Sequence, residues 1–196
     1  MKRSLFWLVL GGIALLAGTI GHQLGESGKS AGTAGTMTAA SSSLRILDLV
    51  LNDLKGQPQA FAQWRGKLLI VNYWATWCLP CREEMPGFSR IQDKYHDKGV
   101  QFVGISIDNV AKIAEFIKAT PVSYPLLVGD IGVMENSAAL GNIQQALPFT
   151  AVFDREGRLV STKLGRLPEA DLERQLVELM SRDPQGLPHA GRAPGT

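Results

Sequence analysis

The chain has 196 residues, of which 20 are basic and 18 acidic, and its formal net charge is +2. Two cysteines are too few for a disulfide-stapled mini-protein, and with three scattered histidines they do not make a structural zinc site. The near balance of charges excludes an extended basic surface for nucleic acid. A domain usually takes about 100–200 residues, so the length indicates one domain with extensions.

The first extension is apolar. Lys2 and Arg3 precede an uncharged stretch of 22 residues that ends before Glu26. A helix needs about 20 apolar residues to cross a membrane, so residues 1–25 are interpreted as a transmembrane anchor or an export signal. No small-x-small cleavage site follows Ile20, which favours an uncleaved anchor. The basic N-terminus then places the rest of the chain outside the cytoplasm.

Two other segments flank a folded region. Residues 26–43 are mostly Gly, Ser, Ala and Thr, which predicts a flexible linker. Residues 182–196 contain three prolines and three glycines and are expected to form a disordered tail. The folded domain is therefore predicted over residues 44–181. It contains 15 basic and 16 acidic residues, so we expect no basic face and no nucleic acid partner.

The folded region alternates between short apolar runs, typical of buried strands, and segments with helical periodicity. Strands are predicted over residues 44–51, 67–74, 100–107, 124–128, 149–153 and 158–164. Helices are predicted over residues 79–98 and 130–141, from Val110 with Asp108 or Asn109 as its cap, and from Pro168 onwards. Residues 154–157 are a turn that joins the last two strands as a hairpin. This order predicts an α/β fold with a mixed central sheet.

Both cysteines lie in the sequence Trp77-Cys78-Leu79-Pro80-Cys81, directly after a predicted central strand and at the start of a helix. Residues i and i+3 of such a helix have Cα atoms about 5 Å apart, which suits a disulfide. The helix dipole and free amide groups favour the thiolate of Cys78, whereas Cys81 is expected to be more buried and to react second. The alternative is a structural disulfide, but so short a loop adds little stability. A redox-active pair is therefore predicted.

The sequence NYWATWCLPCREEMP, from Asn72 to Pro86, resembles the thioredoxin superfamily and, within it, the TlpA/ResA/DsbE-like membrane-anchored thiol-disulfide oxidoreductases. The resemblance extends over residues 44–181. It implies a thioredoxin-like fold, with a mixed central sheet flanked by helices, an N-terminal strand extension and a strand–helix insertion near residues 124–141.

The same resemblance implies a function. It suggests a periplasmic enzyme, anchored to the inner membrane, that reduces disulfides of client proteins, for example in cytochrome c maturation or metal-site assembly. The reaction would be dithiol–disulfide exchange at Cys78 and Cys81, with no metal or other cofactor. A membrane thiol donor of the CcdA or DsbD type would restore the dithiol, and the domain is expected to be a monomer.

Glu84 is a further candidate for catalysis. A glutamate on a helix is ordinarily solvated, and we expect this of Glu83. In the family, however, a glutamate at the position of Glu84 lies near the active site and tunes the thiols, and Asn72 occupies the place of a buried aspartate in thioredoxins proper. Glu84 is therefore the candidate for proton transfer with Cys81. A carboxylate there would raise the pKa of the thiols by like-charge repulsion.

Three residues are candidates for client binding. Trp77 adjoins the nucleophile. Only about 5–6% of X-Pro bonds are cis, but the resemblance implies a cis bond before Pro148, placed against the two cysteines. The backbone of Leu147 would then pair with an extended client segment, as in strand addition.

Two other functions use the same cysteines. A thiol oxidase or isomerase would run the exchange in another direction, and the dipeptide Leu79-Pro80 does not decide between them. A module that binds Cu(I) through both thiols is the third possibility. It is disfavoured because no histidine or methionine motif accompanies the cysteines, although Met85 is nearby.

Overall fold

The computed structural model describes residues 46–182, and the predicted anchor at 1–25 and linker at 26–43 lie outside them. Of the predicted tail, Arg182 is the last residue of a helix, and residues 183–196 are not described. No helix within residues 46–182 has the length and apolar character needed to span a bilayer.

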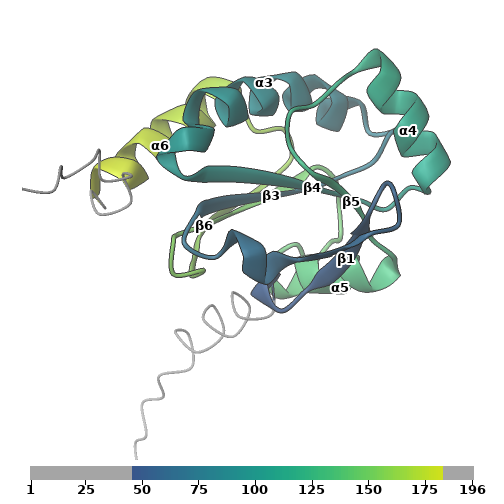
Figure 1. Ribbon diagram of the computed structural model, residues 1–196, viewed down its shortest axis with the longest axis horizontal. Coiled ribbons are helices and arrows are strands. Elements are labelled where there is room, and N and C mark those ends of the chain that lie inside the picture. Colours follow the sequence, from purple (N-terminus) through teal and green to yellow (C-terminus); the bar gives the residue numbers. More distant parts are fainter. Residues whose placement is uncertain (1–45, 183–196) are drawn as a thin grey trace, which may run out of the picture. The chain divides into compact units, whose positions relative to one another are not determined.

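A seven-stranded mixed sheet forms the centre of the described chain (Figure 1). Its strands follow the spatial order β2-β1-β5-β4-β3-β6-β7. The central strands β3, β4 and β5 are parallel, and the other pairs are antiparallel. The strands are β1 (Val50–Asp53), β2 (Pro58–Ala60), β3 (Leu68–Trp74), β4 (Val100–Ser106), β5 (Leu126–Val128), β6 (Phe149–Phe153) and β7 (Leu159–Leu164).

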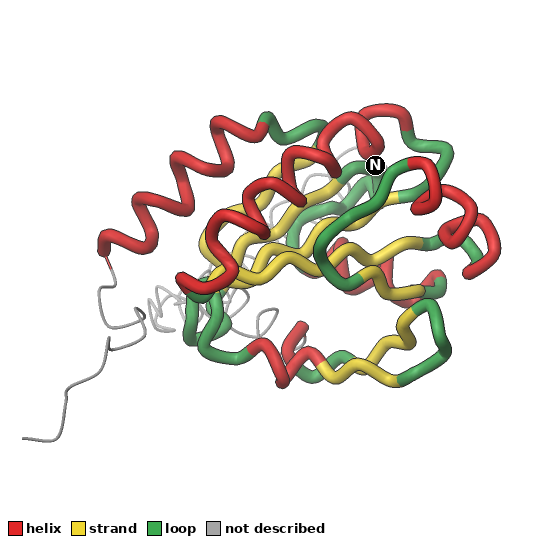
Figure 2. The backbone as a smooth tube through the Cα atoms, turned by 45° about the horizontal axis from the view of Figure 1, so that its top comes forward, coloured by secondary structure: helices red, strands yellow, loops and turns green. Residues whose placement is uncertain are grey.

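Helices cover both faces of this sheet (Figure 2). They are α3 (Leu79–Tyr95), α4 (Val110–Ala119), α5 (Ile131–Ala139) and α6 (Glu169–Arg182), with the short 3-10 helices η1 (Phe61–Trp64) and η2 (His96–Lys98). The predicted α/β class and mixed sheet flanked by helices are confirmed. The strand and helix expected near residues 124–141 are β5 and α5.

Strand β3 lies between two apolar cores. Its residues Leu68, Ile70 and Trp74 pack with residues of α3, α4 and α6, whereas Leu69, Val71 and Tyr73 pack with residues of η1 and α5. Burial on both faces explains why this strand is an unbroken apolar run, apart from one position. The exception is Asn72, which the alternation of side chains directs towards α3.

The strand predicted over residues 44–51 is wrong for most of its described length. Ile46 and Leu47 belong to a helical turn, and β1 begins only at Val50. Both residues of the turn are buried in the core beneath η1 and α5, so they do not alternate between two faces as strand residues do. The predicted N-terminal strand extension is nevertheless present, because β1 pairs with β2 and with β5.

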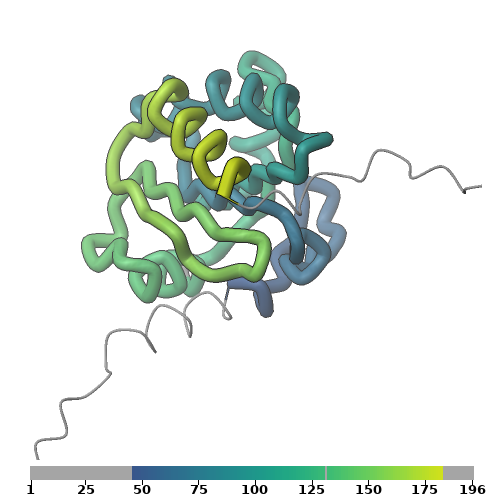
Figure 3. The backbone as a smooth tube through the Cα atoms, turned by 90° about the vertical axis from the view of Figure 1, so that its left-hand side faces the viewer, coloured from purple at the N-terminus to yellow at the C-terminus, as the bar shows by residue number. Residues whose placement is uncertain are grey.

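Helix α6 lies alongside α3 (Figure 3). Arg90 of α3 donates two hydrogen bonds to Glu169, and Glu173 accepts hydrogen bonds from Lys94 and Tyr95. Exposed ion pairs of this kind contribute only about 0–1 kcal/mol each, so the buried Leu172 and Leu176 do more to hold α6 in place. The packing matters for the site because the segment that leads into α6 reaches the start of α3.

Candidate active site

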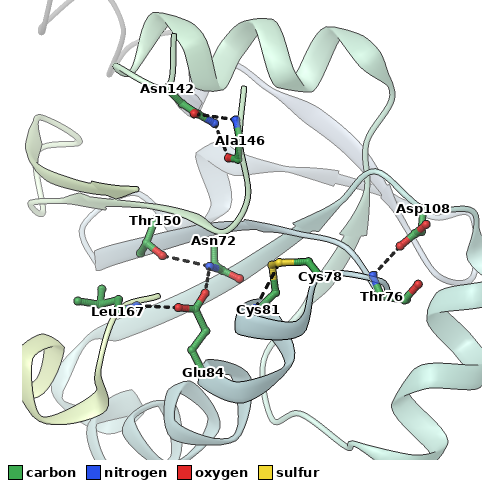
Figure 4. The surroundings of a disulfide bond; sticks show 10 residues. All are labelled: Asn72, Thr76, Cys78, Cys81, Glu84, Asp108, Asn142, Ala146, Thr150 and Leu167. Atoms are coloured by element: carbon green, nitrogen blue, oxygen red, sulfur yellow. Dashed lines mark hydrogen bonds between the residues drawn. A yellow bond between two sulfur atoms is a disulfide. The ribbon is translucent and has the colours of Figure 1, made fainter. Parts of the chain in front are cut away.

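Cys78 and Cys81 form a disulfide at the N-terminus of α3, where the chain leaves β3 (Figure 4). Their Cα atoms are 5.3 Å apart, as the helical spacing predicts. Cys78 is the N-cap residue of the helix, and its Sγ accepts a hydrogen bond from the amide of Cys81 at 3.3 Å. Cys81 is completely buried and Cys78 is 5% exposed, so Cys78 is the more accessible of the two, as predicted.

The loop between β3 and Cys78 is attached to the neighbouring strand. The amide of Thr76 donates a hydrogen bond of 2.6 Å to Oδ2 of Asp108, a buried residue that follows β4. Of the two caps predicted for α4, Asp108 and Asn109, the structure has Asn109. Because β3 and β4 are parallel, their carboxyl ends meet at one edge, and this register brings Asp108 to the redox loop.

Replacing Asp108 is expected to loosen this loop. The Asp108→Ala variant leaves the Thr76 amide without its partner, which should lower the free energy of unfolding by about 1–3 kcal/mol. Asn109→Ala is the matched control, since it removes the cap of α4 at a cost of about 1 kcal/mol and leaves Thr76 untouched. Hydrogen exchange separates the two: the Thr76 amide should lose protection only in Asp108→Ala. Retained protection would show that Asp108 does not hold the loop.

Glu84 is buried one turn beyond Cys81, with 4% of its surface exposed. Its Oε1 accepts a hydrogen bond from Nδ2 of Asn72 at 2.9 Å, and its Oε2 accepts one from the amide of Leu167 at 2.8 Å. Asn72 Nδ2 also donates to Thr150 Oγ1 on β6, at 3.0 Å. The carboxyl group is thus held by β3 and by the segment before α6 (Figure 4).

Burial raises the pKa of Glu84 from 4.5 to about 7. The two hydrogen bonds and the positive charge of Arg166 oppose this rise in pKa but do not cancel it. At neutral pH the carboxyl group can therefore either take up or release a proton. The neighbouring Glu83 is half exposed and pairs with Arg166 at 3.5 Å, as expected for a solvated glutamate.

A redoxin family profile matches residues 31–176 of the chain, which is more than half of its length. The chain belongs to the redoxin family.

Thiol-disulfide oxidoreductases and thioredoxin-related proteins are similar to this redoxin in sequence or in structure. The thiol-disulfide oxidoreductase ResA of Geobacillus kaustophilus (strain HTA426) is 28% identical over 133 residues, which cover 67% of this chain and 74% of ResA. A thioredoxin-related protein from Neisseria meningitidis serogroup B matches with a TM-score of 0.60 and 35% identity, covering 67% of this chain and 98% of that one. A thiol:disulfide interchange protein from Chlorobium tepidum TLS matches with a TM-score of 0.62 and 25% identity, covering 67% and 92%.

These likenesses confirm the thioredoxin-like fold. Together with the Cys78–Cys81 disulfide, they make this redoxin a thiol-disulfide oxidoreductase whose partners are disulfides of client proteins.

The residues predicted to bind clients lie around the carboxyl end of β3, where the disulfide is. Trp77 is 65% exposed, whereas Trp74 is fully buried. The Leu147–Pro148 peptide bond is cis, as the resemblance implied. Phe149 pairs with Tyr73, so Pro148 stands level with Trp74, and Leu147 lies beside the start of the redox loop. Leu147 also packs against the apolar cluster that includes both cysteines.

Two contributors to the site were not identified from the sequence. The Leu167 amide and Thr150 complete the surroundings of Glu84, although they lie 83 and 78 residues from their hydrogen-bond partners. An amide group carries no sequence signal, and a threonine in a strand is common. The apolar Leu167 itself could only indicate burial.

Proposed function

We propose that this redoxin is an extracytoplasmic protein-disulfide reductase. The observation that carries the proposal is a two-cysteine redox pair whose outer cysteine caps a helix and whose inner cysteine is buried near an ionisable Glu84. In this arrangement the outer cysteine, which keeps 5% of its surface exposed, would meet the client, and the fully buried inner cysteine would react only with the outer one. Neither thiol requires a metal or an organic cofactor for the exchange.

The reaction begins with the reduced protein. The thiolate of Cys78 attacks one sulfur of a client disulfide, forming a mixed disulfide and releasing the other client sulfur as a thiolate, which takes up a proton. Cys81 then attacks Sγ of Cys78. The client leaves as a dithiol, and the protein retains the Cys78–Cys81 disulfide, so two electrons pass to the client. The hydrogen bond from the Cys81 amide to Cys78 Sγ would stabilise the thiolate in the first step.

Glu84 is proposed to take the proton of Cys81 in the second step. The two residues are three positions apart on α3 and therefore lie on the same face of the helix, towards β3. A base with a pKa of about 7 is suited to this transfer near neutral pH.

Client binding is assigned to Trp77, Leu147 and Pro148. Within the described chain, Leu147 forms no backbone–backbone hydrogen bond, so its amide and carbonyl groups are available to an added strand. The exposed indole of Trp77 offers apolar contact next to the attacked sulfur. The client would thus lie between the start of α3 and the segment before β6.

The sequence supports a cellular setting for this activity. Residues 1–25 would anchor the protein to the inner membrane, and residues 26–43 would let the domain turn freely in the periplasm. Because the periplasm is kept oxidising, a membrane thiol donor of the CcdA or DsbD type would have to restore the dithiol. Clients in cytochrome c maturation or metal-site assembly require the same chemistry.

The midpoint potential of the Cys78–Cys81 pair tests the direction of the reaction. A reductase is expected to lie near the value of thioredoxin, about −270 mV, when equilibrated with a dithiothreitol redox buffer. A value near −120 mV, typical of a strong oxidant, would instead identify a thiol oxidase.

No observation favours the Cu(I) module. Met85, the methionine next to the pair, is fully buried in the core.

A further inference from the structure

The side chain of Asn142 holds the segment that leads to Leu147. Its Oδ1 accepts a hydrogen bond from the Ala146 amide at 3.0 Å, and its Nδ2 donates to the Ala146 carbonyl at 2.9 Å (Figure 4). The carboxamide therefore satisfies both backbone groups of the residue before Leu147. The Asn142 carbonyl also accepts a hydrogen bond from the Gln145 amide, at 2.8 Å, which closes the loop.

Asn142 is itself anchored to helix α5. Its side chain is 1% exposed, and Nδ2 donates a second hydrogen bond to Ser137 Oγ at 3.1 Å. Ser137 is completely buried and donates to the Met134 carbonyl at 2.8 Å. The amide of Asn142 also bonds to the Ser137 carbonyl, at 3.0 Å. The loop from 142 to 147 is thus joined to α5 by a buried polar network, which rigidifies it.

This rigid loop presents an apolar side chain to solvent. Ile143 is 85% exposed, more than any other large hydrophobic residue of the described chain, and it contributes little to the core. It lies four residues before Leu147, whereas the exposed Trp77 and Leu79 flank Cys78. Apolar side chains therefore stand on both of the segments that would border a client, and neither Ile143 nor its neighbours Asn142 and Gln144 carries a charge.

We propose that Asn142 is a positioning residue for the client strand and that Ile143 selects clients with an apolar side chain beside the attacked cysteine. The inference rests on the proposed function, since it concerns the client that Cys78 reduces. Asn142 keeps Ala146 fixed, so Leu147 offers its backbone in one conformation and the client does not have to order it. Ile143 then contacts the side chains of the paired segment.

The test uses the full chain in detergent, reduced beforehand, and three disulfides as probes. Two synthetic peptides each carry one internal disulfide and differ only in having Leu or Asp beside one cysteine. The third probe, 2-hydroxyethyl disulfide, is too small to reach the loop. The rate of protein oxidation is measured for each probe by trapping the remaining thiols. The wild-type protein is expected to react about tenfold faster with the Leu peptide than with the Asp peptide.

Four variants separate the two roles. Ile143→Ala should reduce the preference for the Leu peptide about three- to tenfold and leave the rate with 2-hydroxyethyl disulfide unchanged. Val177→Ala is the matched control, because Val177 is a 47% exposed aliphatic residue on α6, and it should change no rate. Asn142→Ala should slow the reaction with both peptides about tenfold and again spare the small disulfide. Ser137→Ala, which removes only the outer anchor, should act in the same direction more weakly.

The results separate a failure of the inference from a failure of the proposed function. If Asn142→Ala does not fold, Ser137→Ala and Ile143→Ala carry the test. Variants that slow the small disulfide and the peptides equally would place the effect at the redox pair, which overturns the inference. Unchanged ratios in folded variants would also overturn it, while the proposed function stands. A wild-type protein that oxidises with none of the three probes would instead refute the reductase itself.

Discussion

The Cys81→Ala variant is expected to accumulate client proteins attached to Cys78. Removing the buried thiol abolishes the second attack, so no thiol of the protein remains to break the mixed disulfide between Cys78 and the client. Steady-state reduction of clients should fall to background. Non-reducing gel electrophoresis of cell extracts should show bands of higher mass that collapse on reduction, and sequencing of the trapped proteins would name the clients.

Cys78→Ala is the matched control for this experiment. It retains Cys81, whose side chain is completely buried and so cannot reach a client disulfide. This variant is therefore expected to trap nothing. Adducts on Cys78→Ala, and none on Cys81→Ala, would reverse the two roles. The trapped clients also bear on the proposed selectivity, because their cysteines should be accompanied by apolar neighbours.

Much of the fold could be predicted because the apolar pattern within one strand or helix depends on which of its faces are buried. Strand β3 is buried on both faces, so its sequence is an apolar run broken only by Asn72. The i, i+3, i+7 spacing of Val110, Ile113 and Ile117 marks α4. The strand predicted over residues 44–51 is wrong because the same apolar residues suit both a strand and a buried turn. Whether Ile46 and Leu47 alternate or pack together depends on the core that receives them.

The same distinction applies to the site. The two cysteines are three residues apart, so their geometry follows from the helix that contains them. The surroundings of Glu84 depend on Asn72 and Leu167, which approach it only through the sheet and the packing of α6. Its burial could therefore not be derived from the residues, and the family resemblance indicated only that Glu84 lies near the active site. The Asn142 network was missed because its partners are backbone groups and a helical serine.

The buried Glu84 should make the protein less stable as pH rises. Its pKa is about 7 in the folded state and near 4.5 in the unfolded chain, so between these values the folded state binds more protons. The free energy of unfolding should therefore fall as pH rises from about 4.5 to 7 and then level off, by on the order of 3 kcal/mol in total. Urea denaturation of the oxidised protein at several pH values measures this slope.

Two glutamine variants isolate the contribution of Glu84. Glu84→Gln cannot ionise, so it should not lose this stability as pH rises. Its free energy of unfolding relative to that of the wild type should therefore increase by on the order of 3 kcal/mol between pH 4.5 and pH 8. Glu83→Gln is the matched control, since it makes the same substitution at a half-exposed position next to Glu84 on α3. Parallel slopes for the wild type and Glu84→Gln would mean that Glu84 has an ordinary pKa.

The same pair of variants tests the proton transfer. If Glu84 takes the proton of Cys81, Glu84→Gln should slow the release of client from Cys78 about 100-fold at pH 7, within the range of general base catalysis. The formation of the mixed disulfide, which involves Cys78 alone, should change much less. The inflection of the release rate near pH 7 should also disappear, because the group with that pKa, Glu84, is replaced by a side chain that does not ionise. A variant that keeps both the rate and the inflection would leave Glu84 as a structural residue and assign the proton to solvent.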